Sequence, residues 1–182
     1  MYSNIIKEED AEIYIYGINQ ILVSVINVSS ALIIGLIFGV FFEIAVFMAT
    51  YIPLRSFAGG YHAKTPLRCY FFSVIMLIVV SICMKYLFVA DWVYYGALVV
   101  AATTILILSP VEDKNKPLEK MEHKVYKKRA ILIMVAEIII GVLLKLMGLE
   151  NLFIAVVFSF VVLSLMLTVG IIKNWVASLN MQ

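Results

Sequence analysis

Long hydrophobic runs separated by short polar stretches make up most of this 182-residue chain. The apolar runs cover residues 21–54, 67–89, 92–108, 131–149 and 152–172. The first run holds 34 residues with one charge, Glu43, and would measure about 51 Å as a single helix. Because the hydrocarbon core of a bilayer is roughly 30 Å thick, we expect this run to fold back within residues 35–40. The pattern therefore predicts six hydrophobic helical segments.

Composition supports a membrane protein, since 64% of the residues are hydrophobic and 14% are charged. A soluble domain of this size could not bury that much apolar surface. We predict an all-α, polytopic helical bundle that forms a single membrane domain over residues 1–182, with the lipid bilayer as a partner. Residues 1–17 place acidic groups among isoleucines and tyrosines, which indicates an amphipathic N-terminal segment. They lack the basic start and small-residue cleavage site of a signal peptide.

Basic residues concentrate in two polar stretches. Of the 14 lysines and arginines, three lie within residues 55–68 and seven within residues 110–129. Two predicted helices separate these stretches, so both lie on one side of the membrane, which the positive-inside rule identifies as cytoplasmic. The net charge is only +2, and we expect no nucleic-acid partner. The two cysteines, Cys69 and Cys83, show no spacing typical of a disulfide framework or a metal site, so no metal or cofactor is predicted.

His62 and Cys69 lie in or beside the first of these polar stretches, between two hydrophobic runs. On one continuous helix their spacing of seven residues would separate them by about 10.5 Å along the axis, which is too far for proton transfer. A thiol and an imidazole that meet in a bent segment would instead match the composition of a cysteine peptidase site. The alternative is a chance proximity without catalysis.

The residues between them favour such a bend. The glycines at 59–60 permit a turn, and Pro66 disfavours helical backbone at Thr65. Thr65 is then the N-cap of the next helix, with Pro66 as its first residue. Cys69 falls in the first turn of that helix, where the helix dipole favours a thiolate. Residues 55–68 are accordingly predicted to form a catalytic loop.

Glu43 is a carboxylate within a hydrophobic run, which is costly and makes it a candidate functional group. It could orient His62 as a third member of the site, as an acid does when it holds an imidazole tautomer. The alternative is a structural ion pair with Arg55 or Lys85. Glu137 is a weaker candidate for the orienting role.

The string over residues 54–70 resembles the signature of the accessory gene regulator B (AgrB) family, in which an arginine, a Gly-Gly pair and a His-Ala pair precede a cysteine. The matching positions are Arg55, Gly59, Gly60, His62, Ala63 and Cys69. The length, the hydrophobicity, the amphipathic N-terminus and the basic loop over residues 110–129 also fit, so the resemblance extends over nearly the whole chain.

The resemblance implies a membrane-embedded cysteine endopeptidase of the cytoplasmic membrane of Gram-positive bacteria. Such an enzyme removes the C-terminal tail of a short AgrD-like quorum-sensing propeptide and promotes its cyclisation to a thiolactone or lactone. Cys69 would be the nucleophile that forms an acyl-enzyme thioester, and His62 the general base and then the general acid. The active site would lie at the cytoplasmic side, and a homodimer could supply a peptide groove.

Several residues of the motif are candidates for substrate binding. They are Arg55, Gly59, Gly60, Lys64 and Arg68. The cations could attract an acidic peptide tail, although they could equally be topology-determining residues of the cytoplasmic face. An alternative function is a small transporter or transport-accessory protein, whose path would be lined by the charged groups within the hydrophobic runs. These are Glu43, Lys85, Glu137 and Lys145. A purely structural partner protein is a third interpretation.

Overall fold

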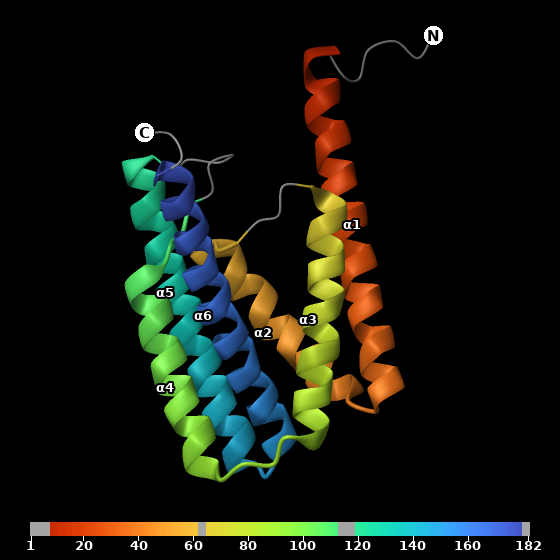
Figure 1. Ribbon diagram of the computed structural model, residues 1–182, viewed down its shortest axis with the longest axis vertical. Coiled ribbons are helices and arrows are strands. Elements are labelled where there is room, and N and C mark those ends of the chain that lie inside the picture. The colour runs from red at the N-terminus through yellow and green to blue at the C-terminus, as the bar shows by residue number, and fades with distance from the viewer. Residues whose placement is uncertain (1–7, 62–64, 113–118, 180–182) are drawn as a thin grey trace.

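The computed structural model describes residues 8–61, 65–112 and 119–179 (Figure 1). These residues form six α-helices: α1 (Glu8–Phe38), α2 (Phe41–Ala58), α3 (Pro66–Tyr86), α4 (Asp91–Leu108), α5 (Lys120–Leu146) and α6 (Glu150–Leu179). Successive helices run in opposite directions, so the α2–α3 and α4–α5 connections lie at the same end of the molecule (Figure 1). The prediction of an all-α bundle with six helical segments is confirmed.

The helices have the length and composition of membrane-spanning segments. Five of them, α1, α2, α3, α4 and α6, are long and apolar enough to cross a bilayer. Helix α5 has 27 residues and is about 40 Å long, but it carries Arg129, Glu137 and Lys145 among its apolar residues. The chain is a multi-pass membrane protein whose outward-facing side chains include many large hydrophobic groups.

The first hydrophobic run folds back where the sequence predicts. Gly39 adopts a φ of 72°, a left-handed conformation that glycine accepts without a steric penalty. The Val40 N–H then donates to the Gly35 carbonyl at 2.8 Å, which closes the end of α1 before α2 begins. Helix α1 is continuous from Glu8 to Phe38, so the described part of the N-terminal segment predicted over residues 1–17 leads into the first hydrophobic run without a break.

Helix α6 is the central element of the bundle. It packs against α2, α4 and α5 (Figure 1). Helix α3 packs mainly on α1, and the pair formed by α1 and α3 contacts the rest of the bundle mainly through α2. The largest fully buried side chains come mainly from α2 and α6, and they include Phe47, Leu54, Phe153, Phe160 and Leu163. Because lipid tails are as apolar as these side chains, close packing rather than hydrophobic transfer holds the helices together.

At the end of the bundle opposite the α2–α3 connection, one lysine joins three helices. Lys145 of α5 donates hydrogen bonds of 2.9 Å to Asp91 at the start of α4 and to Glu150 at the start of α6. Both carboxylates are more than 60% exposed, so solvent screens the two ion pairs. Lys145 is thus engaged with two carboxylates at the end of the bundle.

Both polar stretches contain more helix than the sequence suggested. Helix α2 continues to Ala58, so Arg55 is helical rather than part of the loop predicted over residues 55–68, whereas α3 begins at Pro66 as the sequence predicts. Likewise, α5 begins at Lys120, within the basic loop predicted over residues 110–129. A capping box between Glu119 and Glu122 explains this early start, because the two residues satisfy each other's backbone N–H groups.

The alternation of helices makes the orientation testable. In a variant lacking both native cysteines, we expect Phe88→Cys, in the α3–α4 connection, to react with a membrane-impermeant maleimide in intact cells. Glu119→Cys, in the α4–α5 connection, should react only after permeabilisation, because its end of the bundle carries most of the positive charge. The opposite labelling pattern would reverse the orientation.

Candidate active site

The connection between α2 and α3 begins at two glycines and ends at a threonine cap. Gly59 and Gly60 have φ values of 77° and 129°, and the Gly59 N–H donates to the Arg55 carbonyl at 2.9 Å. The Thr65 side chain accepts a hydrogen bond from the Arg68 N–H at 3.4 Å, and Pro66 is the first residue of α3. The predicted N-cap and helix start are confirmed.

Cys69 lies at the start of α3. Its N–H donates to the Thr65 carbonyl at 3.1 Å, which is the first backbone hydrogen bond of the helix, and its side chain is partly exposed. Phe72 follows Cys69 by three residues on the same helix face, and its ring contacts the ring of Tyr61 with centroids 5.7 Å apart. The Cys69 face of α3 is therefore directed toward the α2–α3 connection. His62 and Lys64 lie outside the described residues.

The beginning of the connection is docked on two distant parts of the chain. Gly59 forms a bridge with Val111, whose N–H donates to the Ala58 carbonyl at 2.9 Å. The Tyr61 N–H donates to the Met166 carbonyl of α6 at 3.1 Å. These bonds fix residues 58–61 against both the α4–α5 connection and the central helix.

Glycines make this close approach possible. A Cβ atom at Gly59 would overlap the Val111 carbonyl oxygen, and a Cβ atom at Gly170 of α6 would lie 3.1 Å from the Tyr61 nitrogen. Neither position has room for a side chain unless a backbone segment moves. Gly59 thus has a structural role in docking the connection, whatever its contribution to substrate binding.

Arg55 joins the last turn of α2 to the connection. Its Nη1 donates to the Tyr51 hydroxyl at 2.6 Å, and its Nη2 donates to the Tyr61 carbonyl at 2.9 Å. Tyr51 is buried and stacks on Phe47, with ring centroids 5.3 Å apart. Arg55, which was predicted to contact substrate, therefore binds the backbone carbonyl of Tyr61, the residue that precedes His62.

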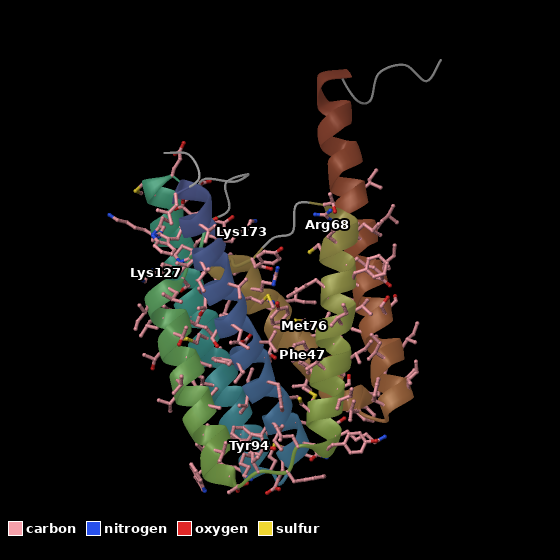
Figure 2. The ribbon with its side chains drawn as sticks, viewed as in Figure 1. Phe47, Arg68, Met76, Tyr94, Lys127 and Lys173 are labelled. Atoms are coloured by element: carbon pink, nitrogen blue, oxygen red, sulfur yellow. The ribbon has the colours of Figure 1, made fainter. Side chains whose placement is uncertain are left out.

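Two further cations lie at this end of the molecule. Arg68 is exposed in the first turn of α3, and Lys173 is on α6 with its Nζ 5.1 Å from the centre of the Tyr61 ring. Figure 2 shows them on different helices at the same end of the bundle. The sequence interpretation missed Tyr51, Tyr61 and Lys173, because no spacing connects α6 to a motif more than 100 residues earlier.

The two acidic candidates lie elsewhere. Glu43 is in the first turn of α2, and the twelve residues that separate it from Arg55 correspond to about 18 Å along the axis. Within the described ranges Glu43 pairs with neither Arg55 nor Lys85, so the structure does not show the alternative of a structural ion pair, and the orienting role toward His62 involves a residue outside those ranges. Glu137 is buried in α5, and its Oε2 has no hydrogen-bond partner among the described residues.

Comparison with known proteins decides the family. The model of the accessory gene regulator B (AgrB) family matches residues 1–171 of the chain. The chain belongs to the AgrB family. An AgrB-like protein 2 of Clostridium perfringens is 29% identical over 131 residues, which cover 68% of this chain and 61% of that protein. An AgrB-like protein of Listeria monocytogenes is 24% identical over 129 residues, which cover 69% and 63% of the two chains.

The chain thus matches less than two thirds of the length of these AgrB-like relatives. No solved structure matches it. The AgrB match includes all of α1 to α5, the motif from Arg55 to Cys69, and most of α6. The family resemblance inferred from the motif is therefore confirmed, and the docked connection described above is part of the region that the family model matches.

The close approach at Gly59 predicts a specific pattern of stability losses. Gly59→Ala and Gly148→Ala both place a side chain at a φ of 77°, and Gly59 also has a ψ of −146°, close to a region of backbone conformation that is essentially restricted to glycine. Only Gly59→Ala also meets a backbone oxygen, whereas nothing lies within 4 Å of a Cβ atom at Gly148. Thermal unfolding in detergent should show a clearly larger fall in Tm for Gly59→Ala. Equal losses would mean that the contact with Val111 adds nothing.

Proposed function

We propose that the chain is a membrane-embedded cysteine endopeptidase that cleaves an AgrD-like propeptide, with Cys69 as nucleophile and His62 as general base and acid. The observation that carries this proposal is the AgrB match over residues 1–171, which includes both Cys69 and His62. The position of Cys69 supports it, because the start of a helix supplies positive potential to a thiolate. The Cys69 face of α3 is also directed toward the segment that continues into His62.

The reaction follows from these two groups. His62 takes the Cys69 proton, and the thiolate attacks the scissile carbonyl carbon to form a tetrahedral intermediate. When this intermediate collapses, the C–N bond breaks, His62 gives its proton to the leaving amine, and an acyl-enzyme thioester remains. The neutral His62 then takes the proton of a thiol or hydroxyl within the bound peptide as that group attacks the thioester carbonyl. Cys69 leaves as a thiolate, and the peptide closes into a thiolactone or lactone.

The surroundings of the site suit this sequence of steps. A thioester is less stable than the amide it replaces, so its hydrolysis by water has to be avoided until the ring closes. A site at the edge of an apolar bundle limits the access of water. Among the candidate cations within the described residues, the exposed Arg68 is the one proposed to attract an acidic peptide tail, because Arg55 is bound to Tyr51 and Tyr61. Added salt would weaken that attraction.

The nucleophile can be tested against an internal control. Cys69→Ala should abolish propeptide cleavage in membranes, with unchanged abundance, because it removes the nucleophile by a small change at a partly exposed position. Cys83→Ala should cleave normally, since Cys83 is near the other end of α3, where its carbonyl accepts from the Leu87 N–H. The measurement is cleavage per molecule of inserted protein. More than a tenth of the wild-type rate in Cys69→Ala, or an equal loss in Cys83→Ala, would overturn the assignment.

Arg55 is expected to act as a positioning residue. Arg55→Lys keeps the charge but cannot bind Tyr51 and the Tyr61 carbonyl through two separate nitrogens. We expect kcat for propeptide cleavage to fall about tenfold, which corresponds to the loss of one charged hydrogen bond, with KM changed less than twofold.

Arg129→Lys is the matched control, because both arginines lie over aromatic rings at the same end of the bundle, Arg55 over Tyr51 and Arg129 over Phe57. It should leave kcat unchanged. A rise in KM at constant kcat in Arg55→Lys would instead indicate that Arg55 binds substrate directly.

A further inference from the structure

The N-terminal part of α5 carries a cationic surface that the proposed peptidase chemistry does not use. His123, Lys124, Lys127, Lys128 and Ile131 line a shallow hollow of about 330 Å³. None of the three lysines forms an ion pair with another described residue. The nearest acidic groups in the helix, Glu119 and Glu122, are joined in the capping box. The surface therefore presents several positive charges without an anionic partner in the described part of the chain.

An apolar stripe continues this cationic surface along the same side of α5. Lys124, Lys128, Ile131, Val135 and Val142 follow one another at spacings of four, three, four and seven residues, which places them in one row on a helix. Val135 and Val142 are 48% and 43% exposed. A different side of α5, with Ala130, Met134, Glu137 and Gly141, is buried in the bundle, so the row lies at the edge of the exposed face.

The length of the stripe matches one leaflet of a bilayer. Ile131 and Val142 are eleven residues apart, or about 16 Å along the helix, and half of a hydrocarbon core of roughly 30 Å is about 15 Å. A lipid molecule combines an anionic phosphate with an acyl chain of this length. The lysines lie at the end of the stripe where the headgroup would be.

We propose that this face of α5 binds an anionic phospholipid, with the phosphate against Lys124, Lys127 and Lys128 and an acyl chain along Ile131, Val135 and Val142. An acidic peptide would use the charges but not the membrane-embedded stripe. Figure 2 also places Lys127 on α5 and Arg68 at the start of α3, on opposite sides of the molecule, so the lysines are remote from Cys69. The proposal is independent of the peptidase activity.

The test measures thermal unfolding of the full chain in zwitterionic detergent. Phosphatidylglycerol at about ten times its Kd should raise Tm by about 3 °C, because it binds the folded state, whereas phosphatidylcholine should not. Glycerophosphoglycerol, which has the same headgroup without acyl chains, should also have little effect. Lys124→Gln/Lys128→Gln should lose most of the rise while its Tm without lipid stays near that of the wild type, since both side chains are exposed.

Arg68→Gln/Lys85→Gln is the matched control, because it removes two positive charges from α3 and leaves α5 unchanged. It should keep the full rise in Tm. Three results would overturn the proposal: an equal response to phosphatidylcholine, a full response in Lys124→Gln/Lys128→Gln, or an equal loss in the control. A full response to glycerophosphoglycerol would mean that the surface binds free anions, and tight competition by a polyglutamate peptide would identify it as a peptide site.

Discussion

The hydrogen bonding of a non-helical backbone within an apolar bundle is the constraint on which the candidate site depends. A membrane protein cannot leave backbone N–H and C=O groups unpaired where lipid surrounds them. Between α2 and α3 the chain meets this requirement through partners far away in the sequence. The Tyr61 N–H is bound by Met166, the Ala58 carbonyl by Val111, and the Tyr61 carbonyl by Arg55. The glycines at 59 and 170 allow these segments to approach closely.

This docking connects the reactive segment to the most buried helix of the molecule. Helix α6 forms the centre of the bundle, so a connection bound to it has less freedom than an ordinary surface loop. Cys69 is held from the other side by the Thr65 cap at the start of α3. A cysteine peptidase needs its nucleophile and its base in a fixed relation, because proton transfer requires hydrogen-bond distances. Helix packing thus supports the chemistry even though α6 contributes no residue of the motif.

Local patterns in the sequence predicted the features that depend on local chemistry. The length of the first apolar run required the turn at Gly39, and the Thr65–Pro66 pair marked the start of α3. Family membership could be recognised from the motif alone. The sequence did not predict the partners of Arg55 or the contact between Tyr61 and α6, because hydrophobic periodicity carries no information about which helices pack together. The sequence interpretation also overestimated the lengths of the loops predicted over residues 55–68 and 110–129, since the helix caps at Gly59 and Glu119 were not recognised.

The most direct test of the account is to isolate the acyl-enzyme. The purified full-length chain would be mixed with a propeptide whose ring-forming thiol or hydroxyl is removed, quenched in acid, and digested for mass spectrometry. We expect the N-terminal part of the propeptide to be attached to the fragment that contains Cys69 and to be released by hydroxylamine, as a thioester would be. Cleavage of the propeptide by the unsubstituted chain without any adduct on Cys69, or with the adduct on Cys83, would contradict it.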